Sequence, residues 1–154
     1  MRTHRILALV ALVPALAVVA SCSDSQDNPS VVDTYSADLA NWPNVNTSAT
    51  GQATFTLFSD NSVSYRIDVT NIQNVTAAHI HAGGLGVTGP IVVGFFGGLF
   101  NGSGLLAEGM FSPSDVTGMA FDELLTRMGT GTVYVNVHTQ ENPGGEIRGQ
   151  ITDQ

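Results

Sequence analysis

The sequence contains no lysine, and only five of its 154 residues are positively charged. Two of the five arginines, Arg2 and Arg5, fall in an N-terminal segment that we expect to be removed. The rest of the chain has three arginines against thirteen acidic residues, a net charge of −10. Nucleic-acid binding requires a basic surface. The composition therefore argues against a nucleic-acid partner, and equally against docking on an anionic membrane through basic residues.

The chain has a single cysteine, Cys22, so it cannot form an internal disulfide. This cysteine directly follows a basic start and an apolar run from Ile6 to Ala20, which is shorter than the roughly 20 residues of a membrane span. The segment Val19-Ala-Ser-Cys22 resembles the lipobox of bacterial lipoproteins. The resemblance implies cleavage before Cys22 and attachment of lipid to this residue, which would hold the protein at a membrane.

Three segments follow from this pattern. We predict a lipoprotein signal peptide at residues 1–21, a polar tether at 22–30 and one domain at 31–154. The predicted location is the bacterial cell envelope, outside the cytoplasm, on the periplasmic or outer-membrane side.

The mature chain shows period-two alternation and turn residues, which are typical of short strands. We predict strands over residues 31–40, 52–58, 62–69, 76–82, 91–96, 105–111, 132–138 and 146–151, with a glycine loop at 97–104. One helical pattern lies near residues 115–128, with Ser114 or Asp122 as its cap. This spacing predicts an all-β fold, a Greek-key β-sandwich or barrel with one short helix.

The histidines carry the strongest functional signal. His79 and His81 alternate on one predicted strand, so both rings point to the same face. In the strand at 132–138 the valines define the apolar face, which places His138 on the outer face. Three histidines suffice for a zinc or copper site with an open position. The alternative is that the three rings are polar positions that bond to covering loops.

Three further polar residues extend this predicted site. Asn136 shares the outer face with His138, and Glu146 and Arg148 alternate outward on the last strand. We expect Glu146 to lie near His138 and to orient its ring. Arg148 is expected either to pair with Glu146 or to face an anion. No catalytic residue is predicted.

Four motifs resemble the CHRD domain family, first described in chordin. They are Thr76-Ala-Ala-His-Ile-His-Ala-Gly83, Gly89-Pro-Ile-Val-Val93, Tyr134-Val-Asn-Val-His-Thr139 and Asn142-Pro-Gly-Gly-Glu-Ile-Arg-Gly-Gln-Ile151. The resemblance covers about residues 35–152. It implies an extracytoplasmic all-β domain, of a kind common in bacterial lipoproteins.

A second resemblance concerns the His-x-His strand and the glycine loop after it, which look like the copper strand of copper/zinc superoxide dismutases. The expected Greek-key fold is therefore immunoglobulin-like or superoxide dismutase-like. The second resemblance implies that His79, His81 and His138 are copper ligands and that Arg148 guides an anion. The mature chain has only three histidines and one cysteine, which excludes the two-metal site of that family.

Three functions stay open from the sequence. The first is a lipid-anchored binding or interaction module of the envelope, with a protein or glycan partner and no enzymatic activity. The second is a mononuclear copper or zinc protein, or a redox enzyme, that uses His79, His81 and His138. The third is a purely structural envelope component.

Overall fold

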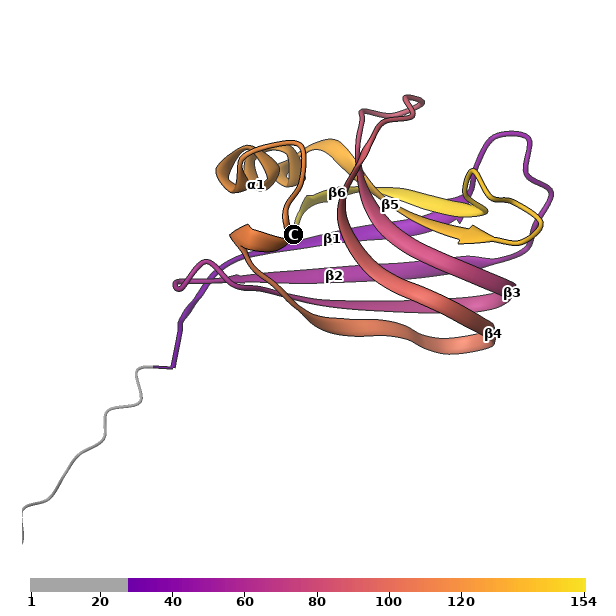
Figure 1. Cartoon of the computed structure of the whole chain (residues 1–154), viewed down its shortest axis with the longest axis horizontal. Coiled ribbons are helices and arrows are strands. Elements are labelled where there is room, and N and C mark those ends of the chain that lie inside the picture. Colours follow the sequence, from indigo (N-terminus) through magenta and orange to yellow (C-terminus); the bar gives the residue numbers. More distant parts are fainter. Residues whose placement is uncertain (1–27) are drawn as a thin grey trace, which may run out of the picture.

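The structure is a computed structural model that describes residues 28–154, so the predicted signal peptide and most of the tether lie outside the described residues. The strands are β1 (Val31–Asn41), β2 (Thr50–Phe58), β3 (Val63–Ala82), β4 (Ile91–Phe111), β5 (Thr130–Thr139) and β6 (Ile147–Asp153) (Figure 1). A 3-10 turn (Pro113–Asp115) and the helix α1 (Phe121–Gly129) separate β4 from β5. The predicted all-β class is confirmed.

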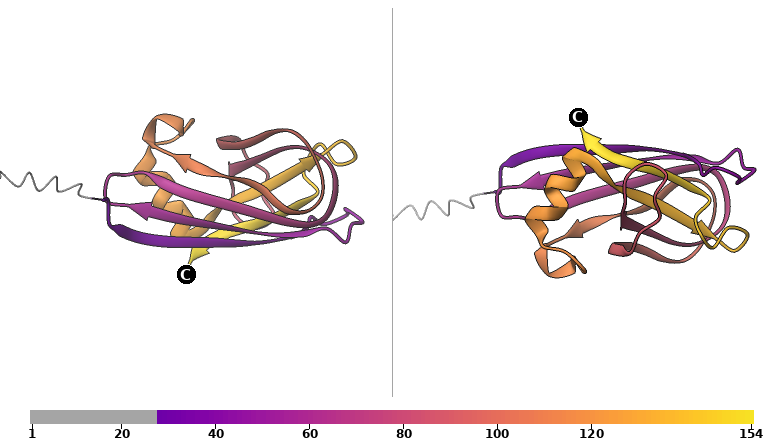
Figure 2. Two further views of the ribbon diagram at one scale, coloured as in Figure 1. Left: turned by 90° about the horizontal axis from the view of Figure 1, so that it is seen from below. Right: turned by 90° about the horizontal axis from the view of Figure 1, so that it is seen from above.

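The strands form one antiparallel sheet that closes on itself. Their order is β2-β1-β6-β5-β3-β4, and β2 also pairs with β3. This extra pairing closes five strands into a barrel-like shape, while β4 continues beside β3 (Figure 2). The closure is possible because β3 pairs with β2 through residues 63–70 and with β5 through residues 75–82.

The longest strands were each predicted as two shorter ones. β3 spans 20 residues without the predicted break, and β4 spans 21 residues across the predicted loop at 97–104. Their ladder contains several register shifts, and Asn71 and Asn74 adopt positive φ angles of 56° and 51°. Asparagine tolerates this conformation. The turn-forming residues therefore bend a continuous strand and do not end it.

Apolar and polar residues alternate along the strands, and the apolar side chains fill the interior of the barrel. Val133, Val135 and Val137 of β5 are fully buried, as are Ile67 and Ile80 of β3. Because successive side chains of a strand point to opposite faces, the histidines next to these core residues point outward. The predicted division of β3 and β5 into an apolar and a polar face is confirmed.

The helix is shorter than predicted and has a different start. It begins after Ala120, whose side chain makes no cap, so neither Ser114 nor Asp122 caps it. Leu124 and Met128 are fully buried and anchor α1 against β5 and β6. Within residues 28–154, no helix has the length and apolarity to cross a membrane.

Candidate metal centre

The pairing of β3 with β5 brings the three histidines together. His79 and His81 lie on β3, and His138 lies on β5, opposite Ala77. One nitrogen from each ring can be chosen so that all three lie within 4.8 Å of one another. The ring centroids are 5.1 to 5.6 Å apart. His138, 57 positions after His81 in the sequence, thus joins the two histidines of β3 in one cluster.

The hydrogen bonds of two rings fix where their protons lie. His81 Nδ1 is 2.9 Å from the carbonyl oxygen of Gly89, and His138 Nδ1 is 2.8 Å from that of Pro143. A carbonyl oxygen only accepts hydrogen bonds, so each Nδ1 carries the proton. In the neutral rings both Nε2 atoms then hold a lone pair, and these atoms lie 3.3 Å apart. Such a pair repels unless a cation lies between the two atoms.

Burial favours the neutral form of His79 and His81. Loss of solvent, together with the smaller effects of the neighbouring rings of His138 and His81, lowers the pKa of His79 to about 4. Burial also lowers the pKa of His81, against the opposing effect of its hydrogen bond to Gly89. Neutral imidazole is the form that ligates metals.

Two buried polar atoms of this face lack a hydrogen bond. They are Nδ1 of His79 and Oδ1 of Asn136, and neither has a partner among residues 28–154. His79 and Asn136 are directly paired across β3 and β5, so their side chains share a face. Asn136 also donates from Nδ2 to the carbonyl oxygen of Gly144 at 3.1 Å. The sequence placed Asn136 on this face, and the structure puts it opposite His79.

Loops cover the outer face of β5 and its neighbours, so this face is largely closed to solvent. Tyr134 is only 1% exposed. Its hydroxyl accepts a hydrogen bond from the backbone N–H of Gly89 at 3.3 Å, and Gln150 donates to the carbonyl oxygen of Gly83 at 3.0 Å. The loop at 83–90 is therefore tied to the histidine face by side chains of β5 and β6.

Glu146 does not contact His138, so the prediction that it orients this ring is wrong. Its carboxylate accepts hydrogen bonds from Thr47, Thr139 and Asn142 at 2.7 to 3.1 Å, and none from His138. Burial alone would raise the pKa of Glu146, but these three bonds outweigh it and leave the pKa below its usual value. Glu146 points into the loops and joins them to the end of the barrel, while the carbonyl of Pro143 orients His138.

Arg148 does not pair with Glu146 either. Its guanidinium carbon lies 3.1 Å from the ring centre of Trp42 and 4.1 Å from that of Tyr134. Tyr134 also stacks on His81, with ring centroids 5.3 Å apart and planes 13° from parallel. An aromatic ring thus separates Arg148 from the histidine cluster.

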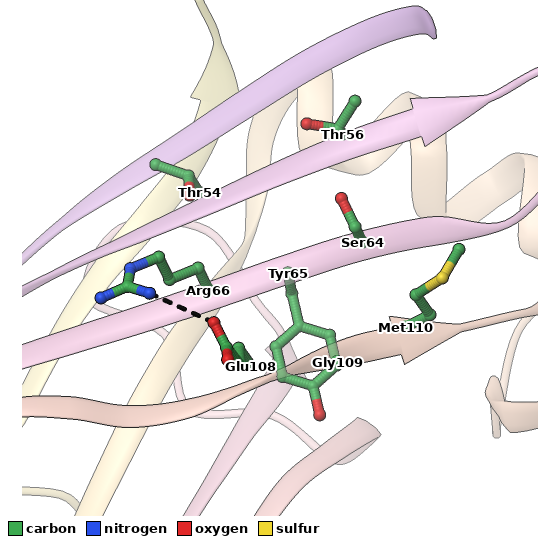
Figure 3. A pocket seen from close by; sticks show the side chains of 8 residues that line it. All are labelled: Thr54, Thr56, Ser64, Tyr65, Arg66, Glu108, Gly109 and Met110. Carbon is green, nitrogen blue, oxygen red and sulfur yellow. Dashed lines mark hydrogen bonds and ion pairs between the residues drawn. The ribbon is translucent and has the colours of Figure 1, made fainter. Parts of the chain in front are cut away.

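A second concave surface lies on another part of the sheet. A shallow groove of about 390 Å³ crosses β2, the start of β3 and the end of β4, among Thr54, Ser64, Arg66 and Met110 (Figure 3). Arg66 forms ion pairs with Asp68 and Glu108, so its charge is already balanced. The groove contains no histidine and no unbalanced charge, which leaves the histidine cluster as the stronger candidate site.

Sequence reasoning missed three groups at the candidate site. The carbonyls of Gly89 and Pro143 carry no signature in the sequence, because every residue has one. Trp42, the single tryptophan of the chain, lies outside every predicted strand and carries no predicted role. Its rarity was the one signal that could have singled it out.

The chain was compared with known proteins. The sequence model of the CHRD domain matches residues 34–151, close to the span of the predicted resemblance, which is therefore confirmed. No curated protein and no solved structure matches the chain.

Proposed function

The chain belongs to the CHRD domain family, and we propose that its domain binds one zinc or copper ion through His79, His81 and His138. The observation that carries this proposal is the separation of 3.3 Å between the Nε2 atoms of His81 and His138, both of which are unprotonated in the neutral rings. An ion between them would turn a repulsive contact into two metal–ligand bonds.

The separation fits metal coordination quantitatively. Zinc–imidazole bonds are about 2.0–2.1 Å long, and tetrahedral geometry then places two ligand nitrogens about 3.3–3.4 Å apart. The third ring, His79, offers a nitrogen within 4.8 Å of the other two. To reach the same ion, the ring of His79 would have to move closer to the other two.

A proton shared between His81 and His138 is the competing explanation. It would satisfy two rings and leave His79 without a role. An ion bound through Nε2 of all three rings would leave the Nδ1 proton of His79 on the same face as the unpartnered Oδ1 of Asn136, the residue paired with His79 across the two strands. His81 and His138 already donate Nδ1–H to carbonyl oxygens, the arrangement that orients metal-bound histidines.

The ligand set selects the class of ion. Three imidazoles suit zinc and copper, whereas calcium and magnesium prefer oxygen ligands. Three protein ligands leave a coordination position for water or another molecule. We propose that this site binds a metal ion, and we assign no reaction to it.

The protein is proposed to act in the cell envelope. The lipobox-like sequence that ends at Cys22 supports a lipid anchor. The acidic composition argues against a nucleic-acid partner. The protein would then be held at the membrane by its lipid alone.

The test is metal analysis of the full-length protein, produced with its own leader and purified in detergent without chelators or a polyhistidine tag. Elemental analysis and calorimetric titration with Zn²⁺ and Cu²⁺ are expected to give one ion per chain. His81→Ala should abolish stoichiometric binding, and Gln52→Ala, an exposed change on β2, should not. Absence of stoichiometric binding to the wild-type chain would overturn the proposal and favour a module that binds an envelope protein or glycan.

A further inference from the structure

Arg148 is a buried positive charge that no acidic residue balances. Residues 28–154 contain three arginines, and two of them are paired: Arg66 with Asp68 and Glu108, and Arg127 with Glu123. Arg148 is only 8% exposed and has no carboxylate oxygen within 4.0 Å among the described residues. Buried arginines are almost always paired, so this one calls for an explanation.

Two aromatic rings lie against the guanidinium of Arg148. Trp42 and Tyr134 flank it at 3.1 and 4.1 Å, which are favourable cation–π contacts. These contacts leave the edge of the guanidinium, where its five N–H groups point, free to donate hydrogen bonds. Among residues 28–154, this edge donates one hydrogen bond, a long one of 3.4 Å to the carbonyl oxygen of Val87.

The acidic residue closest in sequence cannot fill this role. Glu146 lies two positions before Arg148, but its carboxylate already accepts hydrogen bonds from Thr47, Thr139 and Asn142. Moving this carboxylate to Arg148 would leave those three buried or part-buried donors without a partner, at an energetic cost. Glu146 is therefore not available as a counter-ion for Arg148.

We propose that the free edge of Arg148 binds a small oxyanion with a planar pair of oxygens, such as a carboxylate or bicarbonate. A guanidinium presents two parallel N–H groups that match such a pair, and it does so best when its plane is held fixed, as Trp42 and Tyr134 hold it here. The low exposure of Arg148 strengthens the attraction and limits the ligand to a few atoms.

This site is separate from the histidine cluster. β5 lies between β3 and β6 in the sheet, so Tyr134 stands between His81 on β3 and Arg148 on β6. An anion at Arg148 would not be a metal ligand. The inference does not depend on the proposed metal site, and it is tested on metal-free protein so that either idea can fail alone.

The single tryptophan of the chain gives a direct readout, because Trp42 lies on Arg148. The metal-free full-length protein, in detergent and at constant ionic strength, is titrated with sodium acetate, sodium bicarbonate, inorganic phosphate and, for comparison, sodium chloride. We expect a saturable change in Trp42 fluorescence with acetate or bicarbonate, and an apparent affinity at least about tenfold weaker for chloride, which has no pair of oxygens to match the two N–H groups. Phosphate also offers two oxygens, but it is larger and tetrahedral, so the buried site should bind it more weakly than acetate.

Variants separate a specific site from a general charge effect. Arg148→Gln should abolish the saturable change, and Arg148→Lys, which keeps the charge and loses the planar fork, should weaken binding by about tenfold. Arg127→Gln removes the same charge from an exposed ion pair, and its apparent affinity for acetate should stay within about twofold of the wild-type value.

A second measurement covers the case in which Arg148→Gln does not fold. In the wild-type protein, the Nε–H nuclear magnetic resonance signal of Arg148 should shift on acetate titration and saturate, while the signals of Arg66 and Arg127, held by carboxylates, stay in place. A linear drift of all three signals, or no saturable response by either method, would mean an adventitious ion only and would overturn the proposal.

Discussion

The Nε2 atoms of His81 and His138 lie 3.3 Å apart while the Nδ1 protons of both rings are donated to backbone carbonyls. Those carbonyls belong to Gly89 and Pro143, in two loops that are distant in the sequence. The loops thus set the tautomer and the direction of the rings, although they supply no ligand. It follows that changes in the loop backbone should alter metal binding without touching a histidine.

Gly89→Ala tests this dependence. A Cβ atom at Gly89 would overlap the carbonyl oxygen of Ala82, so the loop must shift and move the acceptor of His81. Displacing such an outer partner typically weakens metal binding by about 10- to 100-fold. Calorimetric titration with Zn²⁺ would measure the change.

Gly84→Ala is the matched control in the same loop. A Cβ atom at Gly84 meets nothing within 4 Å. Its Zn²⁺ affinity should equal that of the wild-type protein, and an equal loss in both glycine variants would contradict a specific role for the Gly89 carbonyl.

Asn136 should act on the third ring. We expect Asn136→Ala to weaken Zn²⁺ binding by about 10-fold or more, because it removes an unpartnered buried acceptor from the face that carries His79. Asn136→Asp keeps an oxygen at this position and should recover most of the affinity. If the alanine and aspartate variants bind Zn²⁺ equally well, Asn136 does not orient His79.

Metal should also stabilise the fold. An ion that binds only the folded chain, at 100 times its Kd, adds about 2.7 kcal/mol to the free energy of unfolding. For a domain of this size that corresponds to a rise in Tm of about 5–10 °C. Thermal unfolding with and without Zn²⁺ would show it, and His79→Ala should lose most of the rise. A metal-induced rise that His79→Ala leaves intact would place the ion elsewhere.

The sequence was sufficient to predict which residues face the core and which face outward. The period of two in β5 separates Val133, Val135 and Val137 from His138, and the same rule puts His79 and His81 on one face. The face of a strand residue is a local property, so it can be derived without knowing the partner strands.

Strand length and contacts between distant residues could not be predicted in the same way. Asn71 and Asn74 are typical turn residues, but here the pairing of β3 with β4 overrides their local preference and the strand continues. The hydrogen bonds of Glu146 to Thr47 and Thr139 depend on how two loops fold back over the barrel end. Loop conformation is set by tertiary contacts, which alternation does not encode.

Glu146 should make the stability of the protein depend on pH. Its pKa is lower in the folded chain than its usual value, so the group stabilises the fold above the unfolded pKa, and that contribution is lost as the pH falls through the folded pKa. Glu146→Gln should cost about 1–3 kcal/mol at pH 7, and the difference from the wild-type protein should shrink below pH 4.5. Urea unfolding of both proteins between pH 3 and 7 measures the difference, and a difference that does not vary with pH would refute the assignment.

Cys22 lies outside the described residues, but its predicted role can be tested on the same protein. If lipid on Cys22 holds the chain at the membrane, the wild-type protein should fractionate with membranes and resist extraction by high salt, because an acyl anchor does not depend on charge. Cys22→Ala should block maturation at this site and leave the unprocessed chain larger by the signal peptide. Ser23→Ala changes the next residue and keeps the thiol, so it should mature normally. Unchanged processing and membrane association in Cys22→Ala would show that the cysteine is not the anchor and that residues 1–21 act otherwise than as a lipoprotein signal.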